Sequence, residues 1–388
     1  MAVTLTGLIP TIYNAMNIIA REQVGFIPAV ARDSSAERAA VGQTVTSPVV
    51  GANALEDITP AAFAAAPPSE TVGTVSMTIQ KSKSYPFGIT GEEQMAASGS
   101  MMNINEQRIA QGFRTITNAV EADLAALHIS ASRAYGTYNT TPFGTAGDLS
   151  DFAQSRKILD DNGAPQSDFH LVMGSGAAAN IRGKQSGLFR VNEAGTDDLL
   201  RRGALGEVQG FDLHTSAQLL TSSAGTMNGA TTNATGYAKG STAITLALAG
   251  TGVAIAGDII TFAGDINKYV VASVAFAGAN PAAGDVITLQ EPGLRVAISA
   301  AATAITVTPA TSRNMFFHRS AIQLATRAPA MPDGGDSSDD VMTLQDPNSG
   351  ITYEFCVYRQ KRQVRYEINL AWGVKMVMPR FAGILIGA

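Results

Sequence analysis

Cysteine is almost absent from this chain of 388 residues, which contains only Cys356. One cysteine can form neither an internal disulfide nor a metal site built from several thiolates. Such usage fits a reducing compartment. Cys356 stands between Phe355 and Val357 in an apolar run, so we expect it to be a small buried hydrophobic side chain.

Histidine is also scarce, and the four histidines are His128, His170, His214 and His318. No two of them share the i, i+4 spacing of a helical metal site, and no His-Glu-x-x-His motif is present. His170 falls in an apolar run that predicts a strand, so we interpret it as a structural imidazole. The sequence offers no convergent His, Cys or acidic constellation. We therefore predict no catalytic residue, no cofactor and no metal site.

Charge is low as well. Charged residues make up 15% of the chain and apolar residues 45%, whereas soluble domains average about 25% charged residues. A free monomer relies on surface charge for solubility, so this composition favours a surface covered by neighbouring subunits. The formal net charge is −5, and no Lys/Arg tract gives the footprint of a nucleic-acid-binding protein.

Long hydrophobic runs are missing too. No run approaches the roughly 18 apolar residues of a membrane span. The N-terminus shows no basic segment followed by an apolar one, as a secretory signal would. We therefore expect a soluble protein that is made in the cytoplasm.

Two polar segments resemble ligand-binding sites but have simpler structural explanations. Gly174-Ser175-Gly176 follows a predicted strand and precedes a predicted helix, the context in which helix N-termini bind phosphate. The rest of the dinucleotide and P-loop motifs is missing, so we predict a tight turn. Asp333, Asp336, Asp339 and Asp340 form an acidic loop whose spacing matches no calcium loop. We predict a solvated loop, with a bound cation or a subunit contact as alternatives.

The local patterns predict an α+β protein. Apolar residues at steps of three and four predict a long helix over residues 103–130. Thr44–Val50 and Thr74–Gln80 alternate as strands do, and predict an extended two-stranded arm. Such a hairpin is marginally stable by itself. Residues 8–24 predict an amphipathic N-terminal helix. Two further apolar runs, Val208–His214 and Met315–Thr326, each predict one strand.

Residues 221–312 differ in composition, because Thr, Ala, Gly and Val dominate and charge is rare. Ala256–Phe262 is echoed by Ala283–Leu289, and Thr242–Leu246 by Thr303–Val307. A Gly-Asp turn that leads into a β-branched run marks the start of a strand. Several such strands predict a small barrel or sandwich, inserted into the main domain.

The order of these elements, together with several local stretches, resembles a known family. The stretches are Arg21–Phe26 at the end of the N-terminal helix, Val41–Val45 and Lys81–Glu93 at the two ends of the arm, Asn314–Ile322 after the inserted segment, and residues 366–380 near the end. They resemble the major capsid proteins of tailed bacteriophages with the Hong Kong 97 fold. The resemblance is greatest to the branch of the Salmonella podovirus coat protein, which carries an inserted β-barrel domain. The inserted segment is shorter here than is typical of that branch.

The resemblance implies a structural protein and not an enzyme. Copies of the chain would assemble through pentamers and hexamers into an icosahedral virion head around double-stranded DNA, in the cytoplasm of the bacterial host. The implied partners are other copies, a separate scaffolding protein, a portal, packaged DNA bound without sequence specificity, and a decoration protein as a further candidate, with no membrane. The alternatives are another virion component, such as a tail or surface-layer protein, and a hydrolase with an accessory β domain.

The resemblance also implies a division of the chain and a set of contact residues. The expected parts are an N-terminal arm helix (1–29), an extended β arm or E-loop (30–91), the spine helix and peripheral domain (92–149), the first part of the axial domain (150–220), the inserted β domain (221–312), the return of the axial domain (313–340) and the closing strands of the peripheral domain (341–388). The candidate inter-subunit residues are Ile12, Met16, Ile19, Arg21, Lys81, Lys83, Tyr85, Asp336, Asp339 and Asp340. For Lys81, Lys83 and Tyr85 the alternative is a charged edge strand that prevents unwanted pairing.

Overall fold

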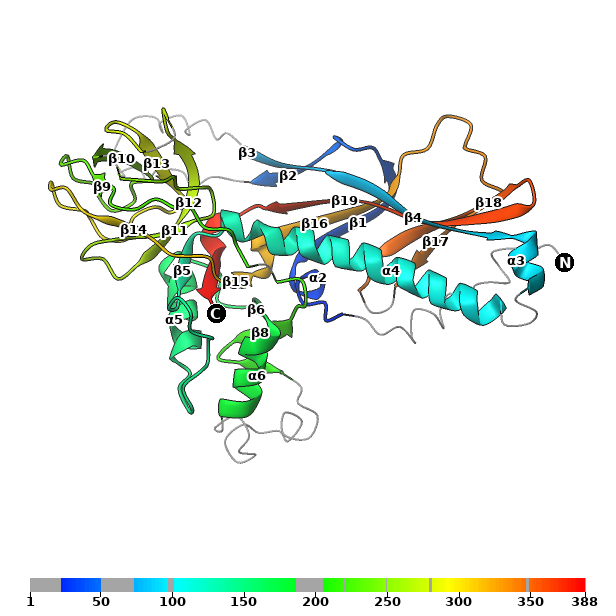
Figure 1. Ribbon diagram of the computed structural model, residues 1–388, viewed down its shortest axis with the longest axis horizontal. Helices are drawn as coiled ribbons and strands as arrows, with labels where there is room; N and C mark the ends of the chain where they lie inside the picture. Colours follow the sequence, from blue (N-terminus) through cyan, green and yellow to red (C-terminus); the bar gives the residue numbers. More distant parts are fainter. Residues whose placement is uncertain are drawn as a thin grey trace, which may run out of the picture.

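The chain forms an elongated α+β protein in which one long helix runs beside a sheet along much of its length (Figure 1). The computed structural model describes residues 22–49, 73–96, 101–185, 205–219, 221–248, 250–278, 281–346 and 349–387. The predicted helix of residues 8–24 lies almost wholly outside the described residues. None of the helices in the described ranges is long and apolar enough to cross a membrane.

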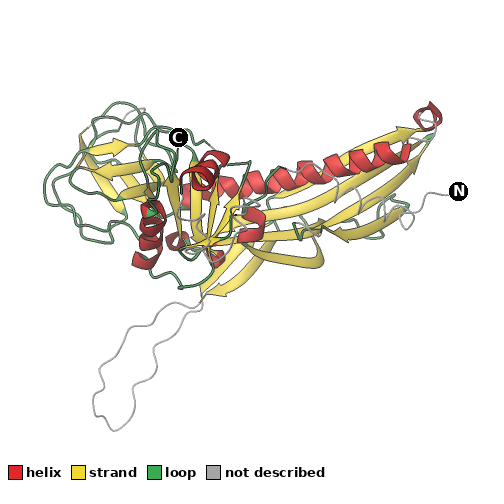
Figure 2. Ribbon diagram, turned by 90° about the horizontal axis from the view of Figure 1, so that it is seen from below, coloured by secondary structure: helices red, strands yellow, loops and turns green. Residues whose placement is uncertain are grey.

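The body of the molecule is a six-stranded sheet beside the long helix α4 (Met101–Ala125) (Figure 2). The predicted apolar stripe of this helix is buried: Ile109, Phe113 and Val120 are at most 1% exposed. After Ala125 the chain continues as a 3-10 turn over Ala126–Ser130. The strands, in order across the sheet, are β1 (Ala31–Ala39), β16 (Ile322–Pro329), β19 (Gln363–Met376), β18 (Thr352–Gln360) and β17 (Asp340–Gln345), and β4 (Lys81–Thr90) also pairs with β19.

Gly112 allows α4 to lie close to this sheet. A Cβ atom at Gly112 would stand 2.6 Å from Ile368 Cδ1 on β19 and 2.8 Å from Tyr85 Cδ1 on β4. Real Cβ atoms do not approach other atoms so closely, because van der Waals repulsion rises steeply below contact distance. The glycine is therefore a packing requirement of the helix–sheet contact.

A second sheet lies near the C-terminus (Figure 1). Its strands, in order, are β7 (Glu207–Val208), β8 (Phe211–Thr215), β6 (Phe169–Met173), β15 (Arg313–His318), β20 (Ala382–Ile386) and β5 (Arg133–Tyr135). The helix α5 (Ser150–Asp161) packs against β20 and β5. The helix α6 (Ser175–Lys184) begins just after Gly174, so the strand–helix turn at this glycine is the tight turn that the sequence predicts.

The strand pairing differs from the sequence expectation in three places. Met315–Thr326, expected as one strand, is divided by a 3-10 turn at Arg319–Ala321, and the two halves join different sheets. The last strand, β20, pairs with β15 and not with the other closing strands. The single strand expected over Val208–His214 is the hairpin β7–β8. Alternating apolar residues reveal a strand but not its partner, so residues 313–340 and 341–388 each supply strands to both sheets.

The segment of residues 221–312 has a hydrophobic core of its own. Alternate residues point into this core, such as Ile244 and Leu246 or Ile260 and Phe262, all at most 2% exposed. Pairing of β12 with β5 connects the segment to the second sheet. Its strands are β9 (Thr231–Thr232), β10 (Ala243–Leu248), β11 (Ile259–Phe262), β12 (Lys268–Ala275), β13 (Val286–Leu289) and β14 (Ile305–Val307).

The sequence repeat in this segment forms the same turn twice. Asp258 Oδ2 and Asp285 Oδ2 each accept a hydrogen bond, at 2.7 Å, from the backbone N–H three residues earlier. The glycine before each aspartate has positive φ, +89° at Gly257 and +94° at Gly284. Each turn leads directly into a strand, β11 or β13, as the repeat predicts.

Candidate interaction surfaces

The first candidate surface is the arm, the hairpin of β2 (Thr44–Val49) and β3 (Gly73–Thr78). Among the described strands these two pair only with each other. The arm is packed at its base, where Met77 and the adjoining Ile79 are 1% exposed. Its other described residues are largely exposed: Thr44, Thr46, Thr74, Ser76 and Thr78. Since a two-stranded hairpin is marginal in water, this arm is suited to lie on another surface.

The second candidate surface is β4, which follows the arm along the chain. The Lys81 ammonium forms an ion pair with Asp123 Oδ1 of α4 at 2.6 Å, and Tyr85 is half-buried against Gly112. These two side chains therefore make contacts within the subunit. Lys83 is exposed. That Lys81, Lys83 and Tyr85 contact a neighbouring subunit stays a prediction.

The third candidate surface is the acidic loop before β17. Asp336 Oδ1 accepts the backbone N–H of Ser338 at 2.9 Å, and Asp336 Oδ2 accepts the Tyr358 hydroxyl at 2.6 Å. Hydrogen bonds from Ser338 and Tyr358 lower the pKa of Asp336 below its ordinary value. Asp339 Oδ2 accepts the backbone N–H of Arg359 at 2.7 Å, and Asp340 begins β17. Within the described residues, these carboxylates form no group of three that could hold a cation.

The structure brings the second and third surfaces together. Lys83 and Asp336 line one surface hollow of about 230 Å³, together with Arg38 and Glu354. Arg38 forms an ion pair with Glu354 across this hollow. The two predicted contact regions are thus neighbours in space, although some 250 residues separate them in the sequence.

Other predicted residues have different outcomes. Ile12, Met16, Ile19 and Arg21 lie outside the described residues. Cys356 is 1% exposed, and burial raises the pKa of its thiol to about 12. That environment fits the predicted role of a small hydrophobic side chain.

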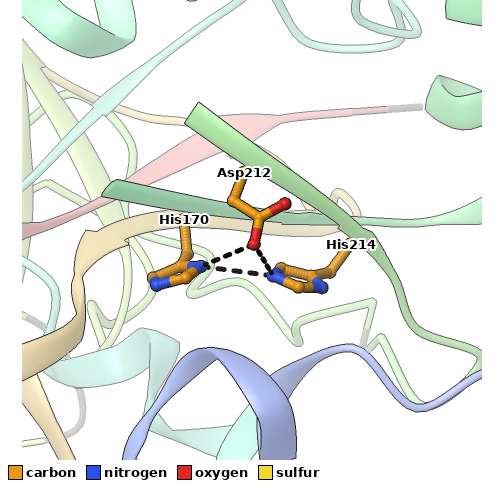
Figure 3. Close-up of side chains that lie close together, drawn as sticks. All are labelled: His170, Asp212 and His214. Atoms are coloured by element: carbon orange, nitrogen blue, oxygen red, sulfur yellow. Dashed lines mark hydrogen bonds and ion pairs between the residues drawn. The ribbon is translucent and has the colours of Figure 1, made fainter. Parts of the chain in front are cut away.

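A cluster that the sequence analysis missed lies on the second sheet, where His170, Asp212 and His214 converge (Figure 3). His170 Nδ1 and His214 Nε2 are 3.2 Å apart, and Asp212 Oδ2 is 3.2 Å from the latter and 3.7 Å from the former. Because β6 and β8 are parallel, with His170 in register with Asp212, all three side chains share one face of the sheet. The sequence spacing of these residues gives no sign of this meeting.

Burial governs the electrostatics of this cluster. Burial lowers the pKa of His170 and of His214 below the usual value for histidine, against the opposing effect of the nearby carboxylates. Both shifts favour the neutral imidazole, in which one ring nitrogen carries a proton and the other a lone pair.

The chain was compared with known proteins. No protein-family model and no curated protein matches it. A structure of Mycobacterium phage Che8 matches with a TM-score of 0.50 and 14% identity, over 95% of this chain and 92% of that one. The capsid of cyanophage P-SCSP1u has a TM-score of 0.49 and 10% identity, over 95% and 90% of the two chains. The mature capsid of bacteriophage PhiM1 has a TM-score of 0.44 and 11% identity, over 92% and 85%.

The match to the Mycobacterium phage Che8 structure extends over nearly the whole chain and concerns the fold. The described helices and sheets confirm the expected α+β class. The more specific likeness to the Salmonella podovirus branch stays a prediction. The chain has a Hong Kong 97-like architecture, with the arm, the long helix and the two sheets described above.

Proposed function

We propose that this chain is the major capsid protein of a tailed bacteriophage. In this proposal its copies assemble through pentamers and hexamers into an icosahedral head that encloses double-stranded DNA. The observation that carries the proposal is the arm. Its described residues extend from the body as two paired strands, and those that are buried lie near the base. The exposed backbone edges and side chains of this part are available to a neighbouring copy.

The fold and the composition support the same proposal. The chain shares its fold with a phage structure over 95% of its length. Its content of charged residues, 15%, is low, as expected for a protein whose surface is covered by other copies. Contacts that repeat head to tail around a symmetry axis close into rings, which is how one chain would form both pentamers and hexamers.

The proposed role is structural, in the virion shell, with assembly in the host cytoplasm. The proposed partners are other copies of the chain, a scaffolding protein, a portal and the packaged DNA, with a decoration protein as a further candidate. We propose that the DNA is enclosed without sequence-specific binding. The net charge of −5 also argues against a positive coat on the DNA, since phosphate contacts require clustered Lys and Arg.

Shortening the arm tests this proposal. In the variant, residues 46–76 are replaced by Asn-Gly, a two-residue hairpin turn, so that the packed base of the arm is kept. With the scaffolding protein present, we expect the wild type to sediment as large assemblies and the shortened chain to remain small but folded. The control Lys239→Glu, on an exposed turn of the β segment, should assemble like the wild type. Normal assembly of the shortened chain would argue against the proposal.

A further inference from the structure

We infer that His170, Asp212 and His214 form a binding site for a transition-metal dication, for which Zn²⁺ is the probe. The site does not depend on the proposed shell function. Two neutral imidazoles and one carboxylate form a ligand set found in zinc and non-haem iron sites. In Figure 3 the two ring nitrogens and the carboxylate oxygen point toward one common position.

The distances fit a metal ion. Zinc binds nitrogen and carboxylate oxygen at about 2.0–2.2 Å, which places the ligand atoms of a tetrahedral site roughly 3.3–3.6 Å apart. The three separations here are 3.2, 3.2 and 3.7 Å. A metal ion at their centre would therefore need only small side-chain shifts.

The surroundings of His170 fit the role of a metal ligand. Histidines that bind metals usually donate their other ring N–H to a carboxylate, which fixes the tautomer. His170 Nε2 is 3.1 Å from Asp168 Oδ1, so a proton on Nε2 leaves the Nδ1 lone pair facing Asp212 and His214. The side chain of His170 is 2% exposed, which holds the ring in place.

Arg319 is the cation that competes in this region. Its Nε–H donates to His170 Nε2 at 3.3 Å, and its Nη2 lies 3.2 Å from the same nitrogen. The Arg319 Nε is also 3.3 Å from Asp168 Oδ2. For the metal-bound form we place the proton on Nε2 and direct it to Asp168 Oδ1, because that contact, at 3.1 Å, is the shortest one. Arg319 then donates to Asp168 Oδ2 in place of His170 Nε2. The charge of Arg319 is thus balanced by a carboxylate that is not a proposed ligand.

The cluster is open on the side of Asp212, whose side chain is 52% exposed, whereas that of His214 is 19% exposed. Glu207 of β7 is in register with Asp212 across the antiparallel pair, so it is on the same face of the sheet. Water or this carboxylate could complete the coordination. In the alternative to this proposal no metal is bound, and His214 Nε2–H donates a hydrogen bond to Asp212.

The test is zinc binding by the purified full-length chain after removal of metals with a chelator. We expect about one Zn²⁺ per chain by equilibrium dialysis and elemental analysis, and a Co²⁺ complex with the visible absorption of a four-coordinate site. Asp212→Asn and His214→Gln should each weaken binding at least about 10-fold. His318→Gln removes a histidine outside the cluster and should bind zinc like the wild type.

A further variant separates the positioning residue from the ligands. Asp168→Asn should weaken binding roughly 10- to 100-fold, yet leave the shape of the Co²⁺ spectrum unchanged, whereas ligand variants should change it. Zinc binding equal in the wild type and Asp212→Asn, or no stoichiometric binding by folded wild type, would overturn the inference. Asp212→Asn decides the matter even if His214→Gln fails to fold, because the Asp212 side chain is half-exposed.

Discussion

At the scale of single residues, Glu121 connects the start of the described chain to the long helix. Its Oε1 accepts the backbone N–H groups of Gly25 and Phe26 at 2.6 and 2.7 Å, and its Oε2 accepts that of Ile27 at 3.1 Å. Glu121 is fully buried. Burial raises the pKa of the carboxyl group, although the backbone donors act to lower it. The donors belong to the first turn of α2 (Phe26–Ala29).

Replacing this carboxylate should destabilise the fold. In Glu121→Gln one oxygen becomes an NH₂ group, so at least one backbone N–H loses its acceptor. A buried donor without a partner costs about 1–3 kcal/mol. We expect this loss in the free energy of unfolding, measured with urea. Glu106→Gln, on a half-buried position of the same helix, should change it by less than about 0.5 kcal/mol. Equal effects of the two variants would contradict the role of Glu121.

The acidic loop gives a prediction about pH. Hydrogen bonds hold the pKa of Asp336 below its ordinary value of 3.8, so the ionised form is favoured in the folded state. Its contribution to stability is present above pH 3.8 and is lost as the pH falls through the lower folded pKa. Tyr358→Phe removes one donor and should raise the pKa of Asp336 toward 3.8, as seen by NMR of the carboxyl carbon. Tyr138→Phe, at an exposed tyrosine, should leave this pKa unchanged; an unchanged value in Tyr358→Phe would refute the assignment.

At the scale of elements, a matched pair of glycines tests the contact between α4 and the sheet. Alanine normally favours a helix over glycine by about 1 kcal/mol. A Cβ at Gly112 would nevertheless strike Ile368 and Tyr85, whereas one at Gly183 in α6 meets nothing within 4 Å. Gly112→Ala should therefore destabilise the protein by about 1–3 kcal/mol, and Gly183→Ala should be neutral or stabilising. The thermal unfolding of both variants measures this difference in stability. Stabilisation by Gly112→Ala would contradict the described packing.

The repeated turns offer a second matched pair. Gly257 and Gly284 both have positive φ, but only at Gly257 would a Cβ meet a neighbour, Ile129 Cγ2 at 2.7 Å. Left-handed backbone costs a residue with a side chain roughly 1–2 kcal/mol. Gly284→Ala should cost about that much, and Gly257→Ala measurably more. Urea unfolding compares the two, and an equal loss would show that the contact with Ile129 does not matter.

Local patterns in the sequence predicted elements well and their partners poorly. The stripe on α4, the paired strands of the arm and the repeated Gly-Asp turns all depend on neighbours in sequence, and all are present. The division of Met315–Thr326 between two sheets depends on contacts made far along the chain. The packing role of Gly112 also depends on contacts with distant residues. Helix propensity alone would mark this glycine only as unfavourable for the helix.

The histidine cluster could not be predicted from local sequence patterns for the same reason. His170 and His214 are 44 residues apart and come together only because β6 and β8 are adjacent and in register. A parallel pairing of this kind leaves no spacing rule in the sequence. Among the predicted contact residues, Lys83 and Asp336 share a hollow, whereas Lys81 and Tyr85 contact their own subunit.

At the scale of the whole molecule, the proposed assembly would explain both the exposed arm and the low content of charged residues, 15%. The body has well-packed hydrophobic cores, so the described fold needs no partner for its centre. The described part of the arm is different, because its buried residues, Met77 and Ile79, lie near its base. A shell subunit with this architecture would use the arm to cover an adjacent copy, and symmetry would repeat that contact around the particle.

The central claim is that copies of this chain build a closed shell. The most direct measurement is negative-stain electron microscopy of the chain expressed with and without its scaffolding protein. The account predicts closed shells with the scaffolding protein, and shells or open spirals of ring-like units without it. A uniform monomer or dimer under both conditions would contradict it.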